Sequence, residues 1–181
     1  ILVCFQGLLG GLRVTLDNLG LAVLHGVVGQ LIFAGFVVIA AMMSQSWKSK
    51  TPMCDRKDQR WALMLVVAMV LQLMLGAAYR HMISDEVLAS KATHLLYTHI
   101  VVAFAILALA VVVGIRLMHR NDPLLKKIGI ALHSLVLLQL LLGGGALIAI
   151  ILHSDTEIPP YEVIVTTAHQ ANGALLLAAS F

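Results

Sequence analysis

Long stretches without a charged residue dominate this chain. They cover residues 1–12, 18–47, 61–79, 92–115, 128–154 and 163–181. A helix needs about 20 apolar residues to cross a hydrocarbon core of about 30 Å, so each of the four interior stretches is long enough for one membrane span. Only 12% of the residues are charged, and the mean hydropathy is +0.96. This composition excludes a soluble enzyme and a nucleic-acid-binding domain, and it makes the lipid bilayer the main partner.

The apolar runs predict helices, because runs this long and uniform lack the alternation of a barrel strand. Six helical segments are expected, at 1–13, 20–44, 61–80, 94–117, 128–152 and 163–181. Short connections make consecutive helices antiparallel neighbours. The predicted fold class is therefore all-α, a multi-pass transmembrane bundle of up-down helices. Because both ends of the chain fall inside apolar runs, we expect a fragment of a longer membrane protein.

Basic residues gather in two of the predicted loops. Segments 45–60 and 116–127 hold nine of the twelve Lys and Arg residues, whereas 13–19, 80–92 and 153–162 hold most of the acidic ones. Cytoplasmic loops of membrane proteins carry an excess of Lys and Arg. The distribution therefore places 45–60 and 116–127 in the cytoplasm of a cell, with a bacterial cytoplasmic membrane as the expected location.

A weak repeat runs through the chain with a period of 66 to 67 residues. The first, third and fifth segments each carry Gln-x-x-x-Gly near the outer end, as Gln6…Gly10, Gln72…Gly76 and Gln139…Gly143. The helix that follows carries a histidine in each case, as His25, His99 and His169. Small residues and amides are common in membrane helix contacts, so the Gln-x-x-x-Gly pattern favours helix packing, with the amide bonding across helices, over ligand contact.

The three histidines lie at one depth. His25, His99 and His169 come 8, 8 and 7 residues after the last outer charge, which places them about 12 Å below it at 1.5 Å per residue. Ionisable groups inside a membrane are costly and by default indicate a functional site. His133 stands alone at its own depth, where we expect it to form a hydrogen bond between helices.

The residue four positions after each of these histidines is small: Gly29, Ala103 and Gly173. A small residue one turn away leaves a flat clearing beside the imidazole. Heme iron takes a neutral imidazole axially, so two level histidines on facing helices could clamp one heme. Three unrelated packing histidines remain the alternative. Zinc or copper fits less well, because no Cys, Asp or Glu shares the layer.

The chain also resembles the heme A synthase family over its whole length. The resemblance is carried by three groups of residues: FQGLLGGLRVT at 5–15 with His25, LQLMLGAAYRH at 71–81 with His99, and QLLLGG at 139–144 with His169. These groups are similar to the third and fourth, the fifth and sixth, and the seventh and eighth helices of that family. The resemblance implies an eight-helix protein built from two similar four-helix halves, of which the first is incomplete here.

The family converts heme O to heme A for cytochrome oxidase biogenesis, oxidising the C8 methyl group to a formyl group. The resemblance implies that His99 and His169 bind a heme b, while His25 faces the substrate heme O. It also implies heme O synthase and cytochrome oxidase assembly factors as partners. The family's second-helix histidine and a nearby catalytic glutamate have no counterpart in this sequence, so we expect the fragment to be inactive by itself.

The resemblance divides the chain into 1–44 as the second half of the amino-terminal bundle, 45–60 as a basic loop, and 61–181 as the heme-binding bundle. Arg80, and less strongly Arg13, are expected to anchor heme propionates at the outer helix ends; contact with lipid headgroups is the alternative. Two other functions remain open. One is a b-type electron-transfer cytochrome without its own chemistry, and the other is a transporter or assembly subunit with packing histidines.

Overall fold

The computed structural model describes residues 1–48, 55–83, 88–152 and 158–181. These residues form α1 (Leu2–Thr15), α2 (Leu19–Met43), α3 (Gln45–Lys48), α4 (Arg56–Met82), α5 (Ala89–Met118), α6 (Pro123–Leu152) and α7 (Pro160–Ser180). No strand occurs among them. The predicted all-α fold class is confirmed.

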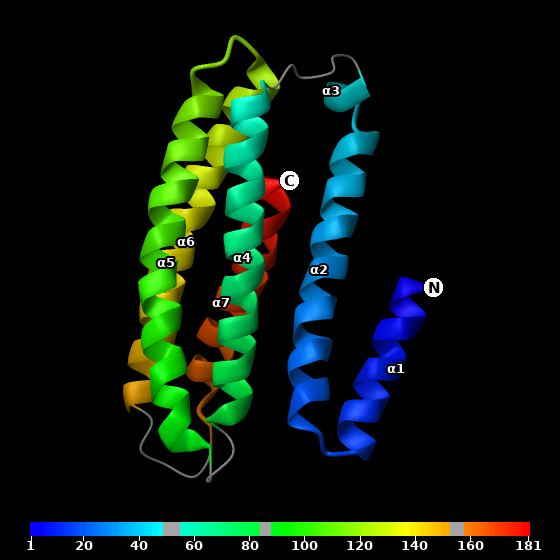
Figure 1. Ribbon diagram of the computed structural model, residues 1–181, viewed down its shortest axis with the longest axis vertical. Helices are drawn as coiled ribbons and strands as arrows, with labels where there is room; N and C mark the ends of the chain where they lie inside the picture. Colours follow the sequence, from blue (N-terminus) through cyan, green and yellow to red (C-terminus); the bar gives the residue numbers. More distant parts are fainter. Residues whose placement is uncertain (49–54, 84–87, 153–157) are drawn as a thin grey trace.

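Helices α4 to α7 form a closed four-helix bundle (Figure 1). Each of these helices packs against the next, and α7 packs against α4 to complete the ring. Helix α2 packs on the outside of this ring against α4 and α7, and α1 packs on α2. The division of the chain at 45–60 stays a prediction.

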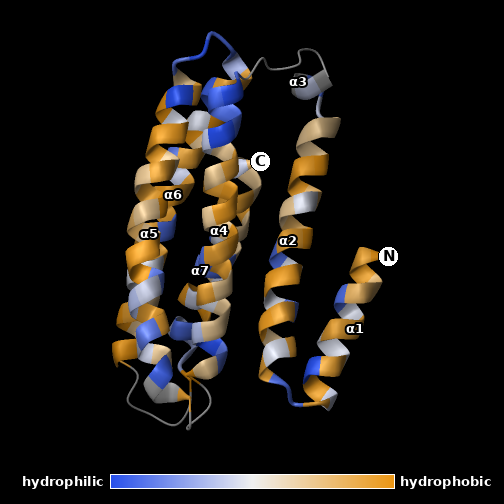
Figure 2. Ribbon diagram, in the orientation of Figure 1, coloured by the Kyte–Doolittle hydropathy of each residue, from blue (hydrophilic) through white to orange (hydrophobic). Residues whose placement is uncertain are grey.

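Four helices are long and apolar enough to cross a membrane: α2, α4, residues 91–118 of α5, and α6. They match the four interior charge-free stretches, so the prediction of four interior spans is confirmed. Figure 2 shows apolar residues along the middle of these helices and polar residues toward their ends. The chain is an integral, multi-pass membrane protein.

The helix ends fall on two sides of the molecule. The α1–α2 turn, the end of α4, the start of α5 and the start of α7 lie together at one end (Figure 1). The start of α4, the α5–α6 turn and α3 lie at the other end. This is the two-sided arrangement that the alternating loops predict, and which side faces the cytoplasm stays a prediction.

The predicted loops are too long at both ends of the bundle. Helix α4 begins at Arg56 rather than at residue 61, because the side chain of Asp55 caps it by accepting a hydrogen bond of 2.8 Å from the backbone N–H of Asp58. Residues 45–48 form the short helix α3, so within 45–60 the described residues are largely helical. Residues 49–54 lie outside the described part. A charged residue therefore marks the end of the apolar run here, and the helix continues past it.

The apolar core occupies the half of the bundle near the α5–α6 turn. Its fully buried members include Leu65 of α4, Ala110 of α5, Leu132 of α6 and Leu176 of α7. On α4 and α6 these residues precede Gln72 and Gln139, and on α5 they follow His99. The predicted polar layer therefore lies in the opposite half of the bundle from this core.

Candidate functional site

Three helical hairpins place a histidine ring over a glycine in the same way. The hairpins are α1–α2, α4–α5 and α6–α7. A Cβ atom added at Gly10, Gly76 or Gly143 would lie 3.0 Å from Cε1 of His25, His99 or His169, respectively. A methyl group at that distance would press on the ring. Each glycine of the Gln-x-x-x-Gly pattern thus makes room for the imidazole of the paired helix.

The glutamines of the first two hairpins bond across the helices. Gln6 Nε2 donates to the backbone carbonyl of His25 over 2.8 Å, and Gln72 Nε2 donates to that of His99 over 2.8 Å. The packing interpretation of Gln-x-x-x-Gly is confirmed for these two hairpins. The repeat in the sequence is therefore a repeat of one interhelical contact.

The third hairpin differs in its hydrogen bonds. Gln139 Nε2 lies 3.3 Å from the ring nitrogen Nε2 of His169. Asn172 Nδ2 donates to Gln139 Oε1 over 2.7 Å and to the carbonyl of Leu135 over 3.0 Å. Sequence reasoning missed Asn172. The available signal was an asparagine three residues after the histidine, at the position that Val28 and Val102 hold in the other hairpins.

The predicted clearing beside the histidines is filled in two hairpins. A Cβ atom at Gly29 would lie 2.7 Å from Gln6 Nε2, and one at Gly173 would lie 3.2 Å from Gln139 Nε2. The expectation of an open clearing at Gly29 and Gly173 is therefore wrong. Because Gly29 and Gly173 have no side chain, the amide of the glutamine on the paired helix can lie against the backbone at these positions.

The bundle brings His99 of α5 and His169 of α7 together. Their ring centroids are 6.4 Å apart, and their planes are inclined by 69°. Two metal–nitrogen bonds of about 2 Å, plus about 1.1 Å from each nitrogen to its ring centre, put two axial imidazoles about 6 Å apart, centre to centre. The rings of two axial ligands can adopt any angle about the shared axis. The separation of His99 and His169 fits two ligands of one iron.

Each of the three rings has a buried nitrogen without a partner in the described residues. The atoms are Nδ1 of His25, His99 and His169. A buried polar atom without a hydrogen bond costs about 1–3 kcal/mol, so a site that carries several is incomplete without a further polar group. These Nδ1 atoms do not identify a ligand by themselves. The fit to an iron porphyrin, which brings four nitrogens of its own and needs two from the protein, rests on the ring separation of His99 and His169.

A bare metal ion fits less well. Within the described ranges, no group of three or more His, Cys, Asp and Glu side chains comes together. Structural zinc takes four protein ligands, and catalytic zinc takes three. The histidine pair is consistent with a group that supplies most of its own ligands.

The structure does not test the roles predicted for His25 and Arg80. His25 belongs to the α1–α2 hairpin, and no ring contact joins it to His99 or His169 within the described part of the chain. Arg80 is exposed in the last turn of α4. The proposed contacts of His25 with a substrate heme and of Arg80 with propionates stay predictions.

The expectation for His133 is wrong. Its Nδ1 contacts the carbonyl of Gly129 in the same helix over 2.8 Å, so the hydrogen bond lies within α6. The ring packs against α5, where a Cβ atom at Gly114 would lie 2.4 Å from its Cε1. The carbonyl of Gly129 lies four residues before His133 in the same helix and is within reach of the ring nitrogen. The close approach of α5 at Gly114 leaves the ring no space to extend further from α6.

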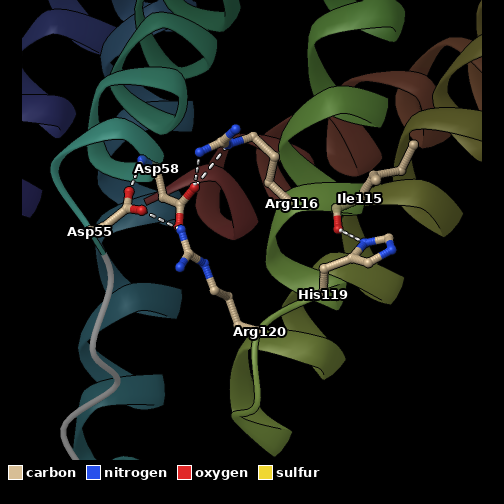
Figure 3. A network of polar contacts seen from close by, with 6 residues as sticks. All are labelled: Asp55, Asp58, Ile115, Arg116, His119 and Arg120. Carbon is tan, nitrogen blue, oxygen red and sulfur yellow. Dashed lines mark hydrogen bonds and ion pairs between the residues drawn. The ribbon is translucent and has the colours of Figure 1, made fainter.

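A network of ion pairs joins α4 to α5 at the far end of the bundle (Figure 3). Asp58 Oδ1 accepts from Arg116, at 2.8 Å from Nε and 2.7 Å from an Nη atom, and Oδ2 pairs with Arg120. Only 1% of the Asp58 side chain is exposed, against 32% for Arg116 and 34% for Arg120. The hydrogen bond from the Asp58 backbone and the Arg120 guanidinium hold the pKa of Asp55 below its usual value. In the sequence these arginines indicate only the topology, and their pairing with Asp58 was not predicted.

Comparison of the chain with protein-family models, with curated proteins and with solved structures finds no match.

Proposed function

We propose that this protein is a heme-binding membrane oxidoreductase of the heme A synthase kind, which acts in the conversion of heme O to heme A. The observation that carries the proposal is the 6.4 Å separation of the rings of His99 and His169. The family resemblance supplies the reaction, and the ring separation supplies an independent reason to expect heme.

In this proposal His99 of α5 and His169 of α7 would hold a heme b. The imidazoles are oriented by Gly76 and Gly143, against which their Cε1 atoms pack. A heme held by two histidines supplies reversible one-electron chemistry at its iron. The chain itself provides an apolar setting and two imidazole rings whose centroids are 6.4 Å apart.

His25 has the same local setting as the histidine pair but sits in the α1–α2 hairpin. We assign it to the substrate heme O, with the oxidation of the C8 methyl group depending on residues outside this sequence. Arg80 would pair with propionates at the outer helix ends. Heme O synthase and cytochrome oxidase assembly factors are the proposed partners, in a bacterial cytoplasmic membrane with 45–60 and 116–127 on the cytoplasmic side.

The ligand assignment is tested with the purified chain in detergent. Protein reconstituted with hemin should show the optical and electron paramagnetic resonance spectra of a low-spin, bis-histidine heme. His99→Ala and His169→Ala should each abolish the low-spin spectrum. His133→Ala is the matched control, since its ring nitrogen bonds within α6. An unchanged spectrum in either ligand variant would rule out the assignment.

The reaction is tested in cells that express the complete gene together with a source of heme O. Pigment extraction should yield the hydroxylated and formylated hemes. A bound bis-histidine heme without any modified heme product would instead favour a b-type electron-transfer cytochrome. Hemin binding and product formation thus separate the cofactor from the chemistry.

A further inference from the structure

We propose that Asn172 and Gln139 fix the tautomer of His169 and cover its ligand nitrogen until heme is loaded. The inference rests on the proposed heme-binding function and assigns two positioning residues to it. It starts from the α6–α7 hairpin, in which Gln139 Nε2 lies 3.3 Å from His169 Nε2.

The orientation of the Asn172 amide is set by the backbone. The carbonyl of Leu135 can only accept a hydrogen bond, and it lies 3.0 Å from Asn172 Nδ2. The atom facing it must therefore be the amide nitrogen, which is a donor. Asn172 is 5% exposed, so water does not offer its amide an alternative partner.

The Asn172 amide in turn sets the orientation of the Gln139 amide. Asn172 Nδ2 is a donor, so the Gln139 atom at 2.7 Å from it must be the acceptor Oε1. The other end of the Gln139 amide, Nε2, then faces His169 and can only donate. His169 Nε2 must accept, which leaves its lone pair toward Gln139 and the ring proton on Nδ1. One backbone carbonyl thus determines the tautomer of a histidine on another helix.

This tautomer is the one that a ligand at Nε2 requires, because metals bind the neutral imidazole through an unprotonated nitrogen. The opposite tautomer would place the Nε2 proton of His169 against the Gln139 amide and leave two donors facing each other. Nδ1 of His169 has no partner among the described residues in either tautomer. The two tautomers therefore differ by the hydrogen bond at Nε2, which is worth about a factor of ten in population, and we expect His169 to be held mainly in the Nδ1–H form.

The other hairpins show where a glutamine goes without such an asparagine. Val28 and Val102 stand where Asn172 stands, and Gln6 and Gln72 donate to the histidine backbone carbonyl instead, over 2.8 Å. We infer that Gln139 covers Nε2 of His169 before loading and moves to the His169 carbonyl when the nitrogen is taken by iron. Asn172 makes that move slower by holding Gln139 Oε1.

The first test measures the tautomer in the heme-free protein. Histidine ring nitrogens labelled with ¹⁵N distinguish a pyridine-like from a pyrrole-like nitrogen, and His169→Ala assigns the signal. We expect a pyridine-like Nε2 in the wild type and a mixture of tautomers in Asn172→Val. Gln139→Met, which keeps the length of the side chain but removes its donor, should give the same mixture. A pyrrole-like Nε2 in the wild type, or an unchanged tautomer in both variants, would overturn the proposal.

The second test follows hemin uptake by stopped-flow absorbance. Asn172→Val should load hemin faster, by about tenfold, while Val102→Ala on α5 should load at the wild-type rate. Equal rates for Asn172→Val and the wild type would overturn the covering role of Gln139. The two tests separate failure of the inference from failure of the proposed function. A chain that takes up no hemin contradicts the heme proposal, whereas the ¹⁵N spectrum still decides whether Asn172 and Gln139 fix the tautomer of His169.

Discussion

The imidazole rings of His99 and His169 lie 6.4 Å apart, centroid to centroid, although 70 residues separate them in the sequence. Helix α5 carries one and α7 the other, and both rings pack on a glycine of the adjoining helix. This pair is a ring contact between two helices that are not consecutive in the sequence. Its consequences can be tested without knowledge of the full reaction.

The glycines under the rings should control heme affinity. Gly143→Ala would place a methyl group 3.0 Å from His169 Cε1 and shift the ring by a few tenths of an ångström. We expect hemin affinity to fall about tenfold, which is about 1.4 kcal/mol. Gly144→Ala is the matched control, since no atom lies within 4 Å of a Cβ there. Hemin titration in detergent measures both, and equal affinities would argue against the ring position as a determinant.

His25 should be dispensable for the low-spin heme. It belongs to the α1–α2 hairpin, and its contacts are with Gln6 and Gly10. His25→Ala should therefore leave the optical spectrum of the reconstituted bis-histidine heme unchanged. Loss of the low-spin signal in this variant would place His25 at the heme of the α4–α7 bundle and contradict the assignment.

The bond between Gln72 and the His99 carbonyl should stabilise the packing of α4 on α5. Gln72→Leu removes a donor 2.8 Å from that carbonyl. Interhelical hydrogen bonds in membranes contribute about 0.6 kcal/mol on average and up to about 1.7 kcal/mol. We expect a loss in that range, measured by denaturant unfolding in mixed micelles. A value near zero would mean that lipid or detergent leaves the carbonyl equally well satisfied.

Removing the carboxylate of the ion-pair network and removing its arginines should lower the free energy of unfolding by different amounts. Asp58→Asn leaves arginines that are about one-third exposed and can reach water. Changing Arg116 and Arg120 together to alanine leaves a carboxylate with 1% of its side chain exposed. Because an unpaired buried charge costs about 3–5 kcal/mol, we expect the double variant to be the less stable one in unfolding measurements. The reverse order would show that Asp58 is hydrated.

Acid should weaken the cap at the start of α4. The pKa of Asp55 is lowered in the fold, first by the hydrogen bond from the Asp58 backbone and then by Arg120. A lowered pKa means that the stabilising contribution is complete above the usual value of 3.8 and is lost as the pH falls through the folded value. Thermal unfolding between pH 6 and pH 2 should show a smaller acid-induced decrease in Asp55→Asn than in the wild type. Parallel curves for the two proteins would mean that this carboxylate does not change its pKa on folding.

The sequence was sufficient for the parts of this protein that depend on the cost of burying charge. Charge-free stretches placed the four long spans within a few residues of α2, α4, α5 and α6. They did not place the helix ends, because Asp55 caps α4 within a charged segment where hydropathy falls but hydrogen bonding favours a helix. The repeat of Gln-x-x-x-Gly likewise predicted amides that bond across helices, as Gln6 and Gln72 do.

Contacts between helices that are distant in the sequence depend on the tertiary structure. Depth along each helix could be counted from the nearest charge, so the sequence put His25, His99 and His169 in one layer. The depth count alone does not say which two of them meet, because that depends on how the hairpins close into a ring. The family resemblance implied that His99 and His169 act together, and the tertiary structure places their rings 6.4 Å apart. Only the tertiary structure ordered Asn172 and Gln139 around His169 and brought Asp58 to Arg116. Hydrophobicity is a property of each stretch of sequence, so the spans can be predicted from the sequence. Hydrogen bonds and ion pairs need two groups, and only the fold decides the distance between them.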